Sequence, residues 1–175
     1  MDFDGDTVAL QLVPEDANIL VCTDLDERFE NKAWAEIIRA SWREDFDRGH
    51  YRYAWSHSEI GEPGDIFEYD KIHTRKYHWI FPVHEVLWPN EGTLDEEHIG
   101  DYKKVIMLHH YQDKTKPRSS YMDLLKLSVE ENPNNPHVMH LFAREFTLRN
   151  EPEPSKYYFH KVLEMPEVHE TRYKQ

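Results

Sequence analysis

Three carboxylates follow a short apolar run near the start of the sequence. Residues 19–22 are apolar without polar alternation, which predicts a buried strand, and Asp24, Asp26 and Glu27 come directly after it. Residues two apart in an extended chain point the same way, so we expect the carboxylates of Asp24 and Asp26 to lie together. Such a pair repels unless a cation lies between its members. Mn²⁺ and Mg²⁺ suit carboxylates and also bind phosphate oxygens. A solvated acidic loop that caps the next helix is the alternative.

Three further groups carry reactive or charged side chains. They are residues 70–75, which hold Lys71, His73 and Arg75, residues 79–85, which end in His84 and Glu85, and residues 109–118, which hold His109, His110, Lys114 and Arg118. Each has an ordinary reading as a solvated cation, a surface His–Glu pair or a chance double histidine. Together they supply metal ligands, a base and phosphate-reaching cations, the parts needed to move a group off a diphosphate.

The stretches between these groups predict a mixed α/β body up to about residue 116. Residues 30–43 predict a helix whose apolar stripe of Trp34, Ile37, Ile38 and Trp42 faces the core. Gly49 is expected to end this unit. The expected strands are residues 50–57, 66–72, 77–81, 83–88 and 104–110, with Pro82 separating two of them.

The remainder of the chain predicts a helical tail. Asn135 is a plausible N-cap and Pro136 suits the first helical position, which places a helix start there. We expect three helices, the last over residues 157–165 after a turn at residues 151–154. A weak echo at an offset of 33 residues, such as Val129 and Val162, fits helix-pair repeats of the tetratricopeptide kind.

Composition excludes some classes of function. The chain of 175 residues has a formal net charge of −13, which argues against binding of nucleic acid through its phosphates. Cys22 is the single cysteine, so an internal disulfide is impossible, and a buried thiol is expected. No apolar stretch has the length of a membrane span and no signal peptide is visible, so a soluble cytoplasmic protein is the expectation.

In their order along the chain, these motifs resemble the second half of the catalytic domain of family 2 nucleotide-sugar glycosyltransferases with an A-type fold. The closest likeness is to the subgroup in which tetratricopeptide-like helices follow that domain. The resemblance spans roughly residues 16–166. The matching stretches are residues 19–27, the expected strand of residues 50–57 with its tyrosines, residues 71–75, Trp79 with residues 82–85, His109-His110, and residues 125–146. The D-x-D alone is a weak signal, and D-x-D-E followed by P-V-H-E is more specific.

The resemblance implies a partial nucleotide-sugar transferase sheet with flanking helices over residues 1–116. A short α-helical hairpin tail of tetratricopeptide-like character is implied over residues 117–175. In this family the metal motif lies much further into the domain than Asp24 does here. We therefore expect the chain to correspond to a C-terminal portion, with a partner chain or a second copy completing the sheet.

The resemblance also implies roles for individual residues. Asp24 and Asp26 match the D-x-D that holds Mn²⁺ or Mg²⁺, which in turn holds the nucleotide diphosphate. His110 matches a histidine that adds a ligand to the metal or the phosphate, with His109 as the second choice.

The proton acceptor and the substrate contacts follow in the same way. Glu85 matches the carboxylate that deprotonates the acceptor in an inverting displacement, and His84 either takes that role or orients Glu85. The match places Lys114 and Arg118 at the phosphate or the acceptor. Trp79 and Tyr53 are candidates to stack on sugars. Core packing is the alternative for each of them, and the two roles stay open at this point.

The resulting prediction is metal-dependent transfer of a sugar from a nucleotide-sugar to an unidentified acceptor. A UDP-sugar is the first choice of donor. Two alternatives remain open. The chain could be a catalytically inactive module that binds carbohydrate or protein, or a metal-dependent phosphohydrolase built on the same acidic cluster.

Overall fold

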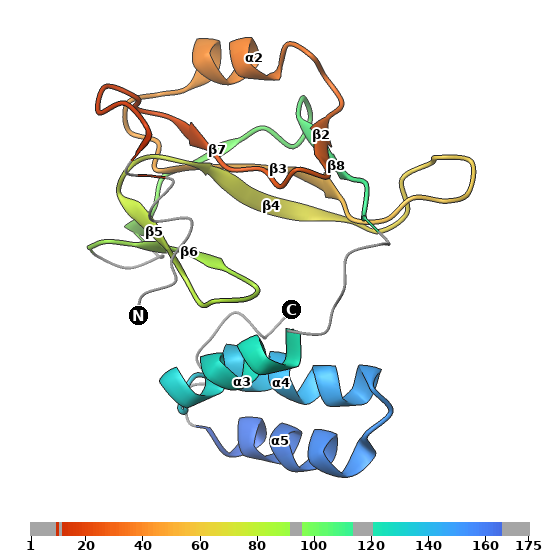
Figure 1. The fold of residues 1–175 in the computed structure, drawn as a ribbon. Helices are drawn as coiled ribbons and strands as arrows, with labels where there is room; N and C mark the ends of the chain where they lie inside the picture. The colour runs from red at the N-terminus through yellow and green to blue at the C-terminus, as the bar shows by residue number, and fades with distance from the viewer. Residues whose placement is uncertain (1–9, 11, 92–95, 114–120, 166–175) are drawn as a thin grey trace. The chain divides into compact units, whose positions relative to one another are not determined.

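The computed structural model describes residue 10 and residues 12–91, 96–113 and 121–165. The chain divides into two compact units (Figure 1). Among the elements with described bounds, the sheet unit holds the strands and one helix, and the helical unit holds three helices together with the segment Phe81–Glu85. The expectation of a mixed α/β chain is confirmed. No helix within the described residues is long and apolar enough to cross a lipid bilayer.

The main sheet is built on two long antiparallel strands, β3 (Arg48–Ala54) and β4 (Ile66–His73). β1 (Leu20–Val21) pairs antiparallel to β4 and ends the strand order on that side. The strand predicted over residues 19–22 is therefore shorter than expected, and only Leu20 in it is buried. Its position at the end of the strand order explains the partial exposure, because such a strand has a neighbour on one side only.

The other side of β3 pairs with two short parallel strands, β7 (Ile99–Asp101) and β8 (Met107–His110). β2 (Glu27–Phe29) pairs antiparallel to β8 and gives the order β1-β4-β3-β8-β2. β1 and β2 therefore end the two sides of the order, yet residues 22–26 alone connect them. Lys71 Nζ of β4 lies 3.6 Å from Glu27 Oε1 of β2, although β3 and β8 separate these strands in the order, so the sheet curls until its two ends come close.

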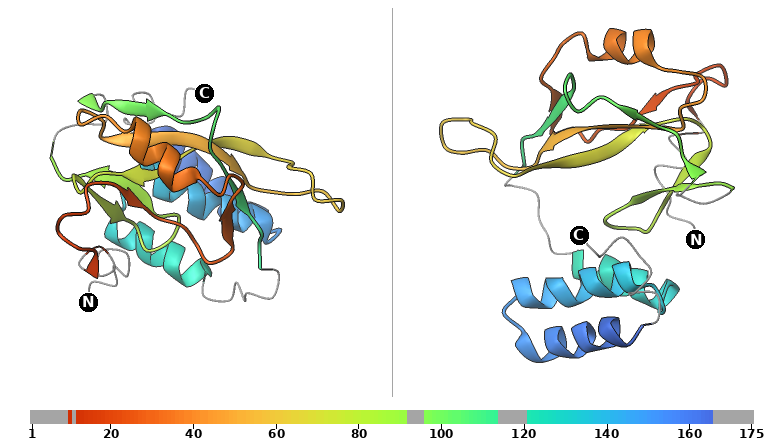
Figure 2. Two further views of the ribbon diagram at one scale, coloured as in Figure 1. Left: turned by 90° about the horizontal axis from the view of Figure 1, so that it is seen from above. Right: turned by 180° about the vertical axis from the view of Figure 1, so that it is seen from behind.

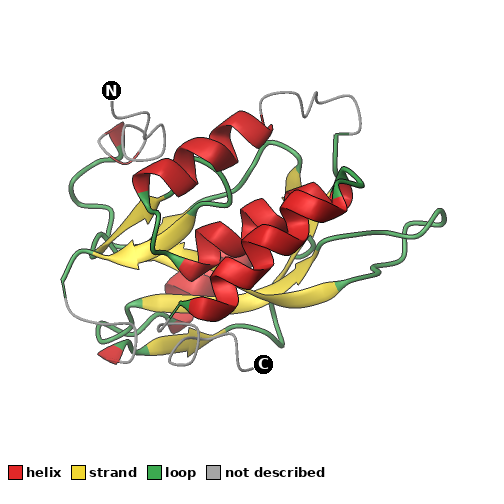
Figure 3. Cartoon of the chain, turned by 90° about the horizontal axis from the view of Figure 1, so that it is seen from below, coloured by secondary structure: helices red, strands yellow, loops and turns green. Residues whose placement is uncertain are grey.

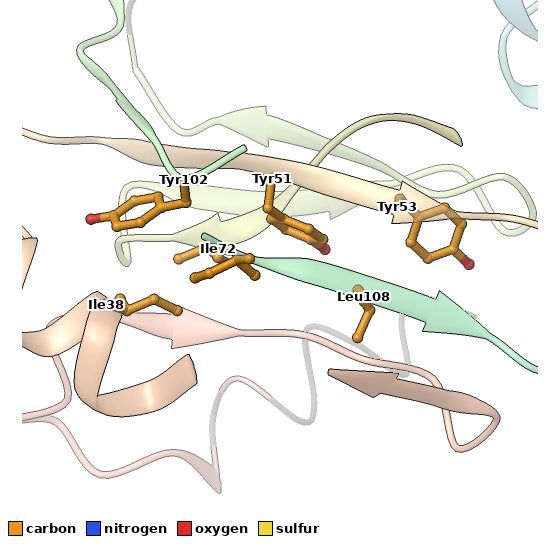
Figure 4. Close-up of a cluster of buried hydrophobic side chains, with 7 residues drawn as sticks. Ile38, Tyr51, Tyr53, Ile72, Tyr102 and Leu108 are labelled. Atoms are coloured by element: carbon orange, nitrogen blue, oxygen red, sulfur yellow. The ribbon is translucent and has the colours of Figure 1, made fainter. Parts of the chain in front are cut away.

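The core of the sheet unit lies between the sheet and the helix α2 (Trp34–Ser41), which crosses one face of the strands (Figure 2). Tyr51 and Tyr53 alternate with Arg52 along β3 and are buried. The seven buried residues of this cluster are Ile38, Tyr51, Tyr53, Ile72, Tyr102, Ile106 and Leu108 (Figure 4). The predicted stripe of α2 packs against them, as expected.

Two local predictions in this unit are wrong. The helix predicted from residue 30 begins only at Trp34, because the Asn31 side chain accepts a hydrogen bond from the Ala33 amide (2.9 Å) and holds a turn there. Gly49 does not end a segment but lies inside β3. A Cβ at Gly49 would lie 2.9 Å from the Tyr102 ring, so the close packing of that ring on the strand requires glycine.

β5 (Tyr77–Ile80) and β6 (Val86–Pro89) form a separate antiparallel pair in the sheet unit. The predicted interruption of the two strands around Pro82 is confirmed. Trp79 is buried between Tyr77 and Leu87, so its ring belongs to a small core and is not a surface for stacking sugars.

The helical unit contains α3 (Tyr121–Glu131), α4 (Pro136–Leu148) and α5 (Pro152–Glu164), and α4 packs against both of the others (Figure 3). The Asn135 side chain accepts hydrogen bonds from the amides of His137 and Val138, which confirms the predicted N-cap. α5 begins at Pro152, earlier than predicted, because proline suits the first turn of a helix. The buried cluster here consists of Leu125, Leu141 and Phe142.

Candidate functional site

The three clustered carboxylates Asp24, Asp26 and Glu27 lie at the turn between β1 and β2. The Glu27 amide donates a hydrogen bond to the Asp24 carbonyl (3.1 Å), and the Asp24 amide donates to the Glu27 side chain (2.8 Å). The prediction that Asp24 and Asp26 lie on an extended chain is therefore wrong, because the amide and the side chain of Glu27 both bond back to Asp24 and close a turn. We call residues 24–27 the acidic turn.

Lys71 of β4 supplies the positive charge beside the acidic turn. Its side chain is 11% exposed, and its Nζ lies 3.3 Å from Asp24 Oδ2 and 3.6 Å from Glu27 Oε1. Burial alone acts to lower the pKa of Lys71, but Tyr69 and the two carboxylates outweigh it and raise the pKa above its ordinary value. Lys71 is therefore charged at neutral pH and joins two of the three carboxylates.

Glu27 is the buried member of the acidic turn, with a fully enclosed side chain, whereas the Asp24 side chain is 67% exposed. The Tyr53 hydroxyl donates a 2.8 Å hydrogen bond to Glu27 Oε1. Burial and then this hydrogen bond raise the pKa of Tyr53 well above its ordinary value. Tyr53 therefore belongs to the core and holds Glu27 in place, and its buried ring offers no open surface to a sugar.

Asp26 meets His110, the last residue of β8. Asp26 Oδ2 lies 3.4 Å from His110 Nε2, and the Asp26 carbonyl accepts a hydrogen bond from the Tyr111 amide (2.7 Å). The His110 ring stacks on Trp55, with 4.7 Å between ring centroids, and Trp55 is about half exposed. The antiparallel pairing of Glu27 with His110 in β2 and β8 explains why these residues meet.

An open hollow of about 400 Å³ adjoins this cluster. It is lined by Leu25, Asp26, Glu27, Arg28 and Tyr111. The Arg28 guanidinium lies over the Tyr111 ring at 5.9 Å from its centroid. Because the Glu27 side chain is enclosed, the hollow offers the carboxylate of Asp26, an arginine and an exposed aromatic ring, groups that bind polar ligands such as sugars and phosphates.

The donors at this cluster partly fit the metal that the sequence predicts. Two ligand atoms bound to one ion at about 2.1 Å lie roughly 3.0–3.4 Å apart, and the Asp26–His110 distance falls in that range. A set of carboxylates and an imidazole suits Mn²⁺ better than Mg²⁺, which prefers oxygen ligands. Asp24 is held by Lys71, however. Among the described residues, no group of three or more His, Cys, Asp or Glu side chains is arranged to hold a metal ion.

His109 has a different environment from His110. Its Nδ1 lies 2.8 Å from His57 Nε2, and both rings stack near Tyr111. Burial, followed by the charge of His57, lowers the pKa of His109. Successive residues of a strand point to opposite faces, so of the two histidines it is His110 that meets the acidic turn.

The side chains of Lys71, His73 and Arg75 in the basic segment lie in three different environments. Lys71 reaches the acidic turn, as described above. His73 is buried, donates from Nδ1 to the Thr74 carbonyl and has its Nε2 3.6 Å from Cys22 Sγ. Arg75 donates to the carbonyls of Val13, Pro14 and Ala17. Only Lys71 is therefore part of the candidate site.

His84 and Glu85 belong to the helical unit. His84 is partly buried and Glu85 is exposed, and His84 has a positive φ of 54°. Lys114 and Arg118 lie outside the described residues. The structure therefore brings Asp24, Asp26 and His110 to one cluster, while the role of Glu85 stays a prediction.

The sequence interpretation placed Lys71 in a charged group but gave it no role of its own at the site, and it missed Trp55 and Arg28. The alternation of β4 was a usable signal for Lys71, because it separates the lysine from its neighbour Asp70 on the opposite face. No comparable signal exists for Trp55 and Arg28, which join the cluster through strand pairing. Compared with known protein families and with curated protein sequences, the chain matches none.

Proposed function

We propose that the acidic turn is the donor site of a glycosyltransferase that moves a sugar from a nucleotide-sugar, first of all a UDP-sugar, to an acceptor hydroxyl. In this proposal the sheet unit is the C-terminal portion of a nucleotide-sugar transferase domain of the A-type fold, and the helical unit is its tetratricopeptide-like tail. A partner chain or a second copy would complete the sheet beyond β1.

The meeting of Asp26 with His110 is the observation that supports this proposal best. The two residues come from different ends of the sheet unit's sequence and approach to 3.4 Å. Lys71 arrives from a third element, beside Asp24 and Glu27. Acidic, imidazole and cationic groups around one turn are the combination that a diphosphate and its metal require.

The proposed reaction is a single displacement. Glu85 takes the proton of the acceptor hydroxyl, with His84 as the other candidate. The acceptor oxygen then forms a bond to the anomeric carbon, and the bond from that carbon to the diphosphate oxygen breaks. The electron pair stays with the diphosphate. Attack from the face opposite the leaving group inverts the anomeric configuration. A positioned base of this kind typically contributes ~10²–10⁴-fold in rate.

Asp24, Asp26 and His110 are the residues that would hold Mn²⁺ or Mg²⁺ at the donor site. When bound, such an ion neutralises the charge that develops on the diphosphate. Lys71 and Arg28 add fixed positive charge near the same place. Lys114 and Arg118 are proposed to contact the phosphates or the acceptor.

Calorimetric titration of Mn²⁺, with and without UDP, tests the donor site. We expect the wild type to bind Mn²⁺, UDP to tighten that binding, and Asp26→Asn to weaken it at least tenfold. Glu44→Gln is the matched control, because Glu44 is an exposed carboxylate outside the acidic turn. Mn²⁺ binding that Asp26→Asn leaves unchanged would contradict the proposal.

One observation favours the second candidate, a catalytically inactive module that binds carbohydrate or protein. Lys71 already holds Asp24 and Glu27 and offsets one of their two negative charges without a metal. A folded wild type that binds neither Mn²⁺ nor UDP, but retains binding to an immobilised glycan, would identify this module.

A further inference from the structure

The segment Phe81–Glu85, between β5 and β6, has an unusual backbone. Phe81 has a φ of 73° and His84 a φ of 54°, and the only other non-glycine residue with positive φ in the described chain is Asn150. Such conformations are strained and persist only where the surroundings impose them. The surroundings of this segment therefore show what its conformation serves.

Three side chains of the segment are held by helices of the helical unit. The Phe81 ring stacks on His137, with 6.0 Å between centroids and 28° between planes. Val83 packs against the cluster formed by Leu125, Leu141 and Phe142. His84 contacts both α3 and α4, as described next. The helices thus impose the strained conformation from several directions.

His84 Nε2 lies against two polar groups. One is the Tyr121 hydroxyl of α3, and the other is Arg144 Nη2 of α4 at 3.3 Å. An arginine nitrogen can only donate, so His84 Nε2 accepts in this contact. A neutral imidazole that accepts at Nε2 has its proton on Nδ1. The contact therefore favours the neutral ring in one tautomer and occupies the nitrogen that a base would need.

The positive charge of Arg144 acts on other histidines of the unit as well. Burial and then the charges of His140 and Arg144 lower the pKa of His137. Burial and then Arg144 lower the pKa of His140. The charge of Arg144 therefore disfavours protonation of both histidines.

We infer that Tyr121 and Arg144 are positioning residues of the transferase, which hold His84 neutral with its proton on Nδ1 and leave Glu85 as the proton acceptor. The inference rests on the proposed function. It removes the ambiguity between His84 and Glu85, and it makes the helices a supporting part of the catalytic segment.

The first test observes His84 directly and needs no substrate. The imidazole resonance of His84 is titrated by NMR in the wild type, Arg144→Gln, Arg144→Lys and Tyr121→Phe. Loss of a positive charge at about 3 Å in a water-like medium is worth ~1 kcal/mol, so we expect Arg144→Gln to raise the pKa of His84 by about one pH unit. Arg144→Lys retains the charge and should restore most of the wild-type value.

Lys126→Gln is the matched control, because Lys126 is an exposed cation of the same unit on α3. It should leave the His84 titration unchanged. Arg144 is itself exposed, so its replacement should leave the protein folded. A His84 titration that is the same in Arg144→Gln and the wild type would overturn the inference.

The second test measures catalysis as release of UDP from UDP-sugars in the presence of Mn²⁺. We expect Arg144→Gln to lower kcat about tenfold without changing KM or the affinity for UDP, and Glu85→Gln to lower kcat by ~10²–10⁴-fold. Arg144→Lys should recover part of the loss. Failure of the wild type to bind Mn²⁺ and UDP overturns the proposed donor site. Unchanged kcat in Arg144→Gln, in a protein that binds both, overturns the positioning role alone.

Discussion

Two buried cations of the sheet unit each bind two carboxylates, yet their environments differ. Arg48 of β3 is 1% exposed, donates to Asp70 and to Glu97, and lies over the Tyr77 ring at 5.3 Å. The Glu97 side chain is 4% exposed, so this triad is closed to solvent on that side. We call it the closed triad.

Lys71 forms the open triad with Asp24 and Glu27. The lysine and Glu27 are buried, but Asp24 is mostly exposed. Lys71 follows Asp70 directly along β4, so the two triads lie on opposite faces of that strand.

The difference shows how one chemical arrangement serves two purposes. In the closed triad, any change of partner leaves a buried charge alone, so the triad contributes to stability. In the open triad, water solvates the exposed Asp24, so its contact with Lys71 can be broken at smaller cost. The predictions below separate these two roles.

Arg48→Met should cause the largest effect. It leaves the buried Glu97 without its cation, and breaking a buried ion pair on one side costs about 3–5 kcal/mol in free energy of unfolding. Urea denaturation measures this loss. Arg43→Met is the control, because its pair with Asp45 is exposed and should contribute less than about 1 kcal/mol. A loss for Arg48→Met that is no larger than the control's would disprove the closed triad.

Lys71→Met should lower the free energy of unfolding by less, about 1–3 kcal/mol. Only the carboxylate of Glu27 then stays buried without a cation, and it keeps its hydrogen bonds from Tyr53 and from the Asp24 amide. The same denaturation measurement applies. Lys103→Met, which breaks an exposed pair with Glu68, should produce no measurable change. If Lys71→Met destabilised the protein as much as Arg48→Met, the distinction between the triads would be lost.

Alkaline pH should weaken the open triad and leave the closed triad intact. We expect this change in free energy of unfolding to be the smallest of the three. The pKa of Lys71 is raised in the folded state, so its contribution is complete below the unfolded value of about 10.4 and is lost as pH rises through the higher folded value. Arginine does not titrate in this range. The difference in free energy of unfolding between wild type and Lys71→Met should therefore shrink above about pH 10.4.

The difference between wild type and Arg48→Met should stay constant over the same pH range. All three proteins are compared in a Tyr69→Phe, Tyr77→Phe background, because the charges of these tyrosines couple to Lys71 and to Arg48. The remaining tyrosines ionise in much the same way in all three proteins and largely cancel in these differences. Parallel behaviour of the two variants would contradict the assignment of the alkaline effect to Lys71.

Local features of the fold were predictable because they depend on neighbours in sequence. The stripe of α2 and the Asn135 cap follow from helical period and hydrogen-bonding geometry. β2 and β7 were not predicted, since three-residue strands carry almost no pattern of their own. Gly49 was misread because glycine breaks many segments, whereas here the packing of Tyr102 requires it.

The sequence by itself determined which residues could do chemistry: the carboxylates of the acidic turn, the His109-His110 pair and the P-V-H-E segment. Only the tertiary structure decided their partners. The curl that brings β1 and β2 together through residues 22–26 lets Lys71 and His110 reach the same turn. The pairing of β8 with β2 selects His110 over His109. These choices depend on contacts between distant residues, which local periodicity does not encode.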